Sequence, residues 1–330
     1  MTAPAAPMHL AAHVPDANGT ADEGSSRRGG FAALAELART AERGLFDFLL
    51  LGRGTRPDGA ADAPEPLAVL PALAAVTDRL GLAGTLGAAL GAPYDLARRV
   101  ASLDHLSAGR AGWHLAVAPD DAARARAAEA TAAAHGLWDS WTPEGAPRPF
   151  AHHGQHHALE GEFTVPRCPQ GRPVAILAGE AGQDRESAAA RADVLLVRHD
   201  TLEEGRAFYA DVKSRLPRYG RAPGDLLVMP VVTVVLGATD AEARRRADRH
   251  GGARPSFAGA PATVAAALDS FVAGGAADGF VLASGGASGG LDDFVARVVP
   301  LLQARGAFRT RYTGTTLRSH LGLPEPVWKG

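Results

Sequence analysis

The sequence predicts an α/β fold, the (β/α)8 TIM barrel, in which eight parallel strands alternate with helices and close into a cylinder. Three observations predict it. Short apolar runs alternate with amphipathic helical stretches along the chain. Eight such runs are present, and one barrel of this class takes about 250 residues or more, so a chain of 330 residues fits one barrel. Most of the runs are continuously apolar, as parallel strands covered on both faces should be. An open doubly wound sheet is the alternative on the same pattern.

The predicted strands are short and rich in Leu, Val and Ala. In chain order they span residues 9–13, 46–51, 81–87, 112–118, 173–178, 193–197, 228–236 and 279–283. Short apolar runs are typical of buried strands, whereas the longer amphipathic stretches between them are typical of helices. The order is therefore strand, then helix, throughout the chain.

Start and stop signals mark several of the helices between these strands. Gly44 stands where the C-terminal cap of the first helix is expected. Thr239 can cap a later helix, because acidic residues follow in its first turn and arginines lie toward its end. Pro261 can open the helix before the last strand, and Gly274 can end it. These signals support the alternation of strands and helices.

Two segments interrupt the alternation. Residues 19–30 are polar and glycine-rich, which predicts a surface loop after the first strand. Residues 141–170 contain several Pro, Gly and His residues without a period, which predicts a loop excursion between the fourth and fifth strands. Long loops inside compact domains often serve as lids or as dimer contacts. We therefore expect residues 1–330 to form one barrel domain that carries this excursion.

Charge and cysteine content exclude several classes of function. The formal net charge is −2 and no basic block is present, so neither nucleic acid nor a membrane is expected as a partner. Cys168 is the only cysteine, which rules out an internal disulfide and favours a reducing compartment. Residues 1–7 lack the regions of a signal peptide, and no apolar run is long enough to span a bilayer. The sequence therefore predicts a cytoplasmic protein.

Active sites of such barrels lie at the carboxyl ends of the strands. This rule nominates His114 as the catalytic candidate, because it is an isolated polar residue near the end of an apolar strand. A hydrogen-bonded core histidine is an equal interpretation. The same rule brings a further set of residues to this end of the barrel, namely His13, Arg53, Gly87, Arg198, His199 and Ser284.

A glycine-rich turn is the strongest local candidate for ligand binding. Gly179, Glu180, Ala181 and Gly182 join the fifth predicted strand to a helix that begins at about Gln183. Exposed backbone N–H groups at such a helix start can hold a phosphate. An ordinary tight turn is the alternative, because Gly-x-x-Gly alone is a weak signal. Glu180 counts against a phosphate, since a carboxylate repels a dianion unless it points away.

Other chemistry is not indicated. His152, His153, His156 and His157 have metal-like spacing, but no carboxylate or cysteine constellation accompanies them, so solvated loop histidines are expected rather than a metal site. A nucleophile elbow, a Walker lysine and a dinucleotide fingerprint after the first strand are all missing from the sequence. Hydrolase and NTPase functions are therefore not expected.

Ordered blocks of sequence resemble one known family. They are Ala-Glu-Arg-Gly-Leu-Phe-Asp at 41–47, Val-Thr-Asp-Arg-Leu-Gly-Leu at 76–82, the block at 97–113 that contains Leu-Asp-His-Leu-Ser-Ala-Gly-Arg, Leu-Trp-Asp-Ser-Trp at 137–141, Pro-Gln-Gly-Arg-Pro-Val at 169–174, and the tail at 275–323. Together they resemble the bacterial-luciferase-like flavin-dependent monooxygenases. The pattern is similar to the branch of two-component FMNH2-dependent enzymes that contains the nitrilotriacetate, dibenzothiophene-sulfone and pristinamycin-type monooxygenases.

The resemblance implies a cofactor, a substrate class and partners. It implies a TIM barrel that borrows reduced FMN from a separate NAD(P)H-dependent flavin reductase and oxygenates a small organic molecule with O2. It also implies a homodimer, or a heterodimer with a homologous subunit. By their position in the family pattern, the expected cofactor-binding residues are Arg53, Thr85, Gly179, Glu180, Ala181 and Gly182.

Several residues at strand ends depart from the family pattern. Arg53 stands where an aspartate is usual, and Glu180 replaces a serine of the phosphate turn. Residues 119–136 are alanine-rich and lack the usual tyrosine, whereas Thr85 keeps a family threonine. The remaining departures replace an Asn, a Ser-Thr pair and a Thr-Ser pair, and they are His114, Gly87 with Ala88, and Val117 with Ala118.

These observations leave three hypotheses. The first is an FMN-dependent monooxygenase, or a related flavin oxidoreductase, with an altered flavin cradle and His114 as its catalytic residue. The second is a non-catalytic, luciferase-like partner subunit that has lost flavin binding, because each lost hydrogen bond to a charged group removes about 1.5–3 kcal/mol. The third is a pocket for another cofactor, such as the deazaflavin F420, with Arg53, His114 and Arg198 facing an anionic group. The first is our prediction, and the second is its main alternative.

Overall fold

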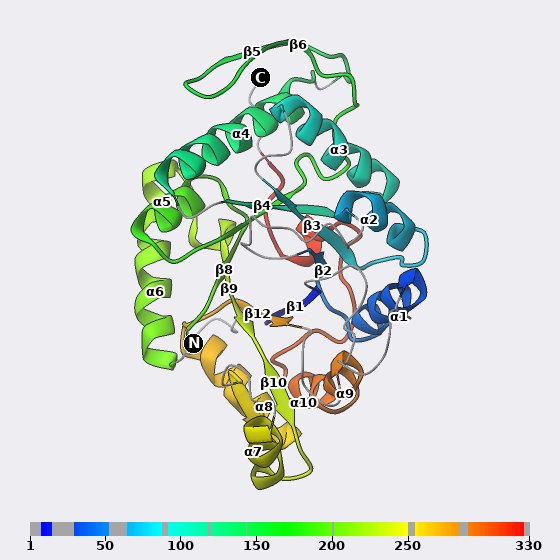
Figure 1. The fold of residues 1–330 in the computed structure, drawn as a ribbon, viewed down its shortest axis with the longest axis vertical. Coiled ribbons are helices and arrows are strands. Elements are labelled where there is room, and N and C mark those ends of the chain that lie inside the picture. The colour runs from blue at the N-terminus through cyan, green and yellow to red at the C-terminus, as the bar shows by residue number, and fades with distance from the viewer. Residues whose placement is uncertain are drawn as a thin grey trace.

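Eight parallel strands close into a barrel in the computed structural model, which confirms the predicted fold class (Figure 1). The structure describes residues 8–14, 30–52, 65–87, 92–117, 120–142, 144–199, 201–249, 255–283 and 290–326. Around the barrel the strands follow the order β1-β12-β9-β8-β7-β4-β3-β2. Their bounds are β1 (His9–Val14), β2 (Phe48–Leu51), β3 (Gly81–Gly87), β4 (Ala111–Ala116), β7 (Val174–Ala178), β8 (Val194–Val197), β9 (Leu227–Val232) and β12 (Gly279–Ala283).

Alternate residues of the strands fill the barrel interior. In β2, Phe48 and Leu50 belong to the interior cluster, while Leu49 and Leu51 pack with the residues of the outer helices. Successive side chains of a strand point to opposite faces, so one apolar run supplies both the interior and the layer beneath the helices. This double burial explains why the strands are continuous apolar runs in the sequence.

Helices surround the barrel (Figure 1). Their bounds are α1 (Gly30–Arg43), α2 (Pro66–Ala74), α3 (Pro93–Leu106), α4 (Asp121–Asp139), α5 (Gly182–Arg191), α6 (Leu202–Arg215), α7 (Asp240–Arg249), α8 (Pro261–Ala273), α9 (Gly290–Arg297), α10 (Val299–Ala304) and α11 (Leu317–His320), with short 3-10 turns η1 (Leu216–Tyr219) and η2 (Pro223–Asp225). Within the described ranges, none of the helices is both long and apolar enough to cross a lipid bilayer.

The predicted helix signals act at their expected positions, with one exception. Thr239 Oγ1 accepts the backbone N–H of Glu242 at 3.2 Å, and Pro261 opens α8, which Gly274 follows. Gly44 follows α1, but the left-handed conformation falls on Leu45, at φ 59°. Gly44 is needed for space instead, because a Cβ on it would lie 2.5 Å from Cγ2 of Val295 in α9.

The helix α11 closes the amino-terminal end of the barrel. Leu317 belongs to the interior cluster, and its backbone N–H donates to the carbonyl oxygen of Gly109 at 3.0 Å. Gly81 at the start of β3 leaves room for it, since a Cβ on Gly81 would lie 2.5 Å from Leu317 Cδ1. The C-terminal part of the chain thus packs against the starts of the strands.

The segment predicted as one strand at 228–236 forms two strands. β9 stays in the barrel, whereas β10 (Val234–Leu236) leaves it and pairs with β11 (Phe257–Gly259). Thr233 lies between them and exchanges two hydrogen bonds of 3.2 Å with Ser256, each from a backbone N–H to the other hydroxyl. This reciprocal pair ties the chain to the second sheet, so the prediction of a single strand was wrong.

The excursion between α4 and β7 contains an antiparallel hairpin of β5 (Pro149–His153) and β6 (Ala158–Glu162). The hairpin lies at one pole of the molecule, next to α4 (Figure 1). Its residues are exposed or partly exposed, and none of them is fully buried. Phe150 and Leu159 are half-buried and pack against the core cluster around Trp138. One such apolar residue in each strand is too weak an alternation to predict a strand from the sequence.

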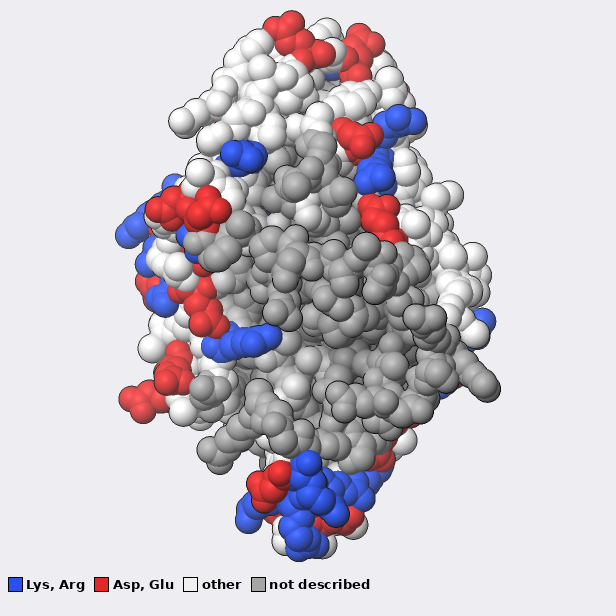
Figure 2. All heavy atoms as spheres, viewed as in Figure 1, with Lys and Arg blue, Asp and Glu red and all other residues white. Residues whose placement is uncertain are grey.

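Arginine side chains gather at the other pole, over α7 (Figure 2). The helix carries Arg244, Arg245, Arg246 and Arg249, together with Asp240 and Glu242. Arg246 pairs with Glu242 at 2.6 Å and donates to the carbonyl oxygen of Leu236 at 2.9 Å. Acidic and basic side chains are therefore mixed on this helix, and Asp240 and Glu242 lie in its first turn, where they favour helix formation.

Candidate functional site

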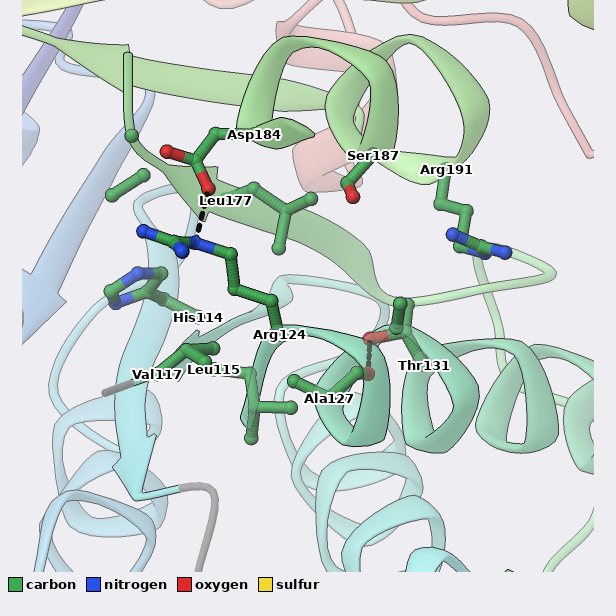
Figure 3. Close-up of a pocket in the computed structure, with 13 residues that line it drawn as sticks. His114, Leu115, Val117, Arg124, Ala127, Thr131, Leu177, Asp184, Ser187 and Arg191 are labelled. Carbon is green, nitrogen blue, oxygen red and sulfur yellow. Dashed lines mark hydrogen bonds and ion pairs between the residues drawn. The ribbon is translucent and has the colours of Figure 1, made fainter. Parts of the chain in front are cut away.

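A cavity of about 330 Å³ lies at the carboxyl ends of β4 and β7 and extends between α4 and α5 (Figure 3). It forms where the two strands stop pairing with each other. The β4–β7 ladder ends at the pair His114–Ile176, and beyond it β4 pairs with β3 and β7 with β8. The gap therefore opens at the end of the barrel where active sites of this fold lie.

The wall of the cavity is largely apolar. Leu115 and Leu177 come from the two strands, and Ala127 and Ala128 come from α4. Because alanine has the smallest side chain with a Cβ, the alanine-rich helix leaves space that larger residues would fill. A cavity of this size accommodates a small organic molecule.

His114 lies at the barrel side of the cavity. Its side chain is buried, with only 2% of the residue exposed, and Nδ1 lies 3.3 Å from Thr85 Oγ1. Burial, with a smaller contribution from His13, lowers the pKa of His114 to about 4. The imidazole is therefore neutral at pH 7, with one nitrogen that donates and one that accepts. The structure thus brings together His114 and Thr85, which were predicted as site residues on separate grounds.

His13 places a second neutral imidazole at the same end of the barrel. Its Nε2 lies 2.7 Å from the carbonyl oxygen of Gly52, which follows β2. Burial lowers the pKa of His13, and the hydrogen bond to Gly52 opposes only part of this shift. Arg53 lies outside the described residues, as do Ala88, Ala118 and Ser284, which the sequence analysis also named.

The turn between β7 and α5 is capped by an aspartate that the sequence analysis did not nominate. Asp184 Oδ2 accepts the backbone N–H of Ala181 at 3.1 Å. Gly179 has a φ of 145°, and a Cβ on it would clash with the Asp184 carboxylate. The carboxylate thus lies within the turn. A sequence signal existed, because an acidic residue three positions after the N-cap is typical of a helix start.

Arg124 of α4 binds the other oxygen of this carboxylate. Its Nε donates to Asp184 Oδ1 at 3.1 Å, and a terminal nitrogen donates to Asp121 Oδ1 at 3.0 Å. Figure 3 shows the side chain reaching from α4 across the cavity to Asp184 on α5. The two partners are 60 residues apart in sequence, so no local pattern could have paired them.

Glu180 is bound away from the amides of the turn. Its Oε1 accepts the backbone N–H of Arg198 at 2.5 Å, at the end of the neighbouring strand β8. The carboxylate that contacts an amide of the turn is therefore that of Asp184 rather than that of Glu180. Ala181 and Gly182 are exposed at the start of α5, as predicted for a turn that opens a helix.

Three histidines of the hairpin contact Glu129 of α4, whereas His153 pairs with Glu160 of β6 at 3.0 Å. The Glu129 carboxylate lies 3.1 Å from His152 Nε2 and accepts the backbone N–H groups of His156 and His157 at 3.0 and 2.8 Å. Burial raises the pKa of Glu129, but these hydrogen bonds outweigh it and lower the pKa to about 2. The prediction of a solvated side chain is wrong for His152, because its partner comes from a helix distant in sequence. Among the described residues, no group of three metal-ligating side chains is present.

Known proteins match this chain along most of its length. The sequence profile of the luciferase-like monooxygenases matches residues 8–278. Nitrilotriacetate monooxygenase component A of Aminobacter aminovorans is 31% identical, over 88% of this chain and 90% of the relative. One of the subunits of pristinamycin IIA synthase from Streptomyces pristinaespiralis is 33% identical, over 88% of each protein. Among solved structures, EDTA monooxygenase (EmoA) from Chelativorans sp. BNC1 has a TM-score of 0.86 at 26% identity, covering 97% of this chain and 99% of that one.

These relatives are members of the branch that the sequence blocks indicated, which confirms the resemblance. The alignment with the nitrilotriacetate protein also reveals a difference in length. It runs over 406 positions and includes 88% of the 330 residues of this chain, or about 290, so about 116 positions of the relative have no counterpart here. These positions fall inside the aligned region. The barrel is thus built from a shorter chain.

Proposed function

The chain belongs to the family of luciferase-like monooxygenases, and we propose that it uses reduced FMN to oxygenate a small organic molecule with O2. The observation that carries this proposal is the cavity of about 330 Å³ at the carboxyl ends of β4 and β7, with the buried His114 beside the barrel. Ligands of this fold bind at that end. Reduced flavin supplies the electrons that activate O2, and the protein supplies binding, orientation and a dry site.

The residues of the site suit the two ends of FMN unequally. His114 and Thr85 offer neutral polar groups beside an apolar wall, a combination that suits a flavin ring. At the glycine turn, the Asp184 carboxylate already takes the N–H of Ala181. A phosphate group carries about 1.5 to 2 negative charges near pH 7 and is repelled by a carboxylate at such a place. The turn in this arrangement does not suit the phosphate.

We assign His114 the role of a neutral hydrogen-bonding group toward the bound molecules. Thr85 engages Nδ1 at 3.3 Å, which leaves Nε2 for a molecule in the cavity. Because burial keeps the imidazole uncharged, it orients a partner without bringing a positive charge into the apolar site. Leu115 and Leu177 exclude water from the same space.

Partner proteins are part of the proposal. We propose a separate flavin reductase as the source of reduced FMN, and a dimer as the working assembly. The two relatives are named as a component of a monooxygenase and as a subunit of a synthase, which indicates enzymes that work with further polypeptides. Sedimentation velocity of the purified protein tests the assembly, since a monomer at all concentrations would exclude a homodimer.

Anaerobic titration with reduced FMN tests the proposed function. We expect saturable binding, and slower reoxidation of the bound flavin than of free flavin when O2 is admitted, because the site excludes water and restricts access. The His114→Gln variant should bind reduced flavin more weakly while its circular dichroism spectrum stays unchanged. If neither reduced FMN nor reduced riboflavin binds, the non-catalytic partner role becomes the better account.

A further inference from the structure

We propose that Asp184 acts as an internal anion that fills the turn between Gly179 and Gly182, so that this protein binds flavin without using its phosphate. The inference rests on the proposed function, because it concerns the same site. It assigns the ligand class as flavins with or without a terminal phosphate. Riboflavin, which lacks the phosphate, should therefore bind about as well as FMN.

The Asp184 carboxylate lies where an anion would bind. Its Oδ2 is 3.1 Å from the backbone N of Ala181, and it lies against Gly179, where a Cβ would clash with it. The N–H of Gly179 is also engaged, because it donates to the carbonyl oxygen of Leu196 at 3.2 Å. The carboxylate further faces the start of α5, where the helix dipole favours negative charge. Two N–H groups of the turn are thus occupied before a ligand arrives.

The two arginines whose side chains contact the turn are already paired with carboxylates. Arg124 binds Asp184 through Nε and Asp121 through a terminal nitrogen, at 3.1 and 3.0 Å. Arg185 follows in α5, and its guanidinium donates to the carbonyl oxygen of Glu180 at 2.9 Å and to Asp211 at 2.8 Å. Both arginines therefore have carboxylate partners. A phosphate that approached the turn would meet the negative charge of Asp184 first.

A phosphate could enter only if Asp184 left. Asp184 would then give up its hydrogen bond from Ala181 and its ion pair with Arg124, and the phosphate would take over the same donors. One anion would replace another, so the phosphate would add little to the affinity. Specificity is a difference between two affinities. The ratio of the dissociation constants of riboflavin and FMN is therefore the quantity that Asp184 controls.

Fluorescence titrations of the purified protein with riboflavin and with FMN measure this ratio. For the natural protein we expect the two dissociation constants to agree within about three-fold, which is a small difference on the scale of binding energies. For Asp184→Ala we expect FMN to bind at least about ten-fold more tightly, because Arg124 and the turn amides can then make charge-assisted hydrogen bonds to the phosphate. Riboflavin affinity should stay the same. Asp184→Asn keeps the contact with Ala181 but loses the charge, so its affinity for FMN should increase less than that of Asp184→Ala.

Glu186→Gln is the matched control. It removes one negative charge from the same helix, but Glu186 binds Arg215 at 2.7 Å and Tyr219 at 2.6 Å rather than the turn. The ratio should not change in this variant. If Glu186→Gln increased the affinity for FMN as much as Asp184→Ala does, net charge would explain the increase and the inference would be overturned. FMN binding more than about ten-fold tighter than riboflavin in the natural protein would overturn it as well.

Inorganic phosphate separates a failure of this inference from a failure of the proposed function. If neither flavin binds, the proposed function fails, but the turn can still be probed through the backbone amide resonances of Ala181 and Gly182. We expect millimolar phosphate to leave them unshifted in the natural protein and to shift them saturably in Asp184→Ala. Saturable shifts in the natural protein, or none in the variant, would overturn the inference.

Discussion

The two ends of the barrel use polar residues in opposite ways. At the amino-terminal end, charged side chains are buried and joined to each other. Asp47 is fully buried, and its carboxylate lies 3.2 Å from His9 and 2.5 Å from Arg309. Arg318 donates to both oxygens of Asp193, at 3.0 and 2.9 Å. These contacts tie the C-terminal part of the chain to the starts of the strands.

At the carboxyl-terminal end, the described polar side chains surround a cavity. His114 and Thr85 share one hydrogen bond of 3.3 Å beside a space of about 330 Å³. The contrast shows that one set of strands serves two tasks. Polar groups that bind one another hold the fold, whereas polar groups that face open space are available to a ligand.

Arg110 shows why the sequence blocks that resemble the family lie at the amino-terminal end of the barrel. Its guanidinium donates to the carbonyl oxygens of Ser107, Leu80, Ala74 and Thr77, at 2.7 to 3.0 Å. The residue lies in the block at 97–113 and joins it to the block at 76–82. Residues at this end of a TIM barrel serve stability, whereas those at the other end serve catalysis. The resemblance is thus concentrated where the fold is fixed.

Of the changes considered, Asp47→Ala should lower the free energy of unfolding most, and it tests the difference between the two ends of the barrel. It leaves Arg309 and His9 without their buried carboxylate, and removing one partner of a buried ion pair costs about 3–5 kcal/mol. Asp184→Ala, the corresponding change at the other end, removes a helix-capping contact that contributes about 1 kcal/mol. Urea unfolding of both variants measures the two losses. Equal losses would show that the ends do not differ in this way.

Acidification should protonate His114 and the buried aspartates Asp47 and Asp193 in different pH ranges. His114 has an ordinary pKa of 6.5, and burial lowers its pKa to about 4 in the folded protein, so the unfolded chain binds more protons between these values. The stability that depends on neutral His114 is complete above pH 6.5 and is lost as the pH falls toward 4, by about 3 kcal/mol in all. In Asp47 and Asp193, burial raises the pKa, but the arginine partners outweigh it and bring the pKa below 3.8, so their contribution is lost only below that pH.

Unfolding free energies measured from pH 7 to pH 3 test these two ranges. In His114→Gln the free energy of unfolding should fall less steeply between pH 6.5 and pH 4 than in the natural protein, because one of the groups that gain protons on unfolding is absent. The decline below pH 3.8 should stay the same. An unchanged slope in the variant would mean that His114 is not buried in its neutral form.

Gly179→Ala should lower the free energy of unfolding less than the loss of Asp47 or the protonation of His114. It tests the turn between β7 and α5. Alanine is disfavoured at φ 145°, and its Cβ would clash with Asp184, so we expect a loss of about 1–3 kcal/mol. The same substitution in an Asp184→Ala background should cost less, because the clashing carboxylate is gone. A double-mutant cycle by urea unfolding gives the difference. The same loss in both backgrounds would place the carboxylate outside the turn.

The frame of the barrel could be predicted from sequence because it depends on local patterns. Each strand is a short apolar run, and Thr239 and Pro261 mark helix starts through contacts within a few residues. Two further elements were wrong or missed, each for its own physical reason. The strand is interrupted at Thr233, which contacts Ser256, 23 residues away, and the hairpin of β5 and β6 partly buries only Phe150 and Leu159 among its apolar residues.

The candidate site could be predicted only in part. His114 follows from the rule that barrel sites lie at strand ends, Thr85 follows from its position in the family pattern, and the turn at Gly179 follows from its glycines. The contact between Arg124 and Asp184 joins two helices 60 residues apart, and no local pattern contains it. The cavity also depends on β4 and β7 ceasing to pair beyond His114, which is a property of the whole barrel.

Hydrogen–deuterium exchange with and without saturating reduced FMN, under anaerobic conditions, tests most directly the claim that the carboxyl-terminal end binds flavin while the other end holds the fold. We predict that flavin protects peptides covering residues 114–117, 124–131 and 178–187. Peptides covering residues 104–110 and 317–321 should exchange slowly and equally in both states. Protection at the amino-terminal end of the barrel, or protection nowhere, would contradict the account.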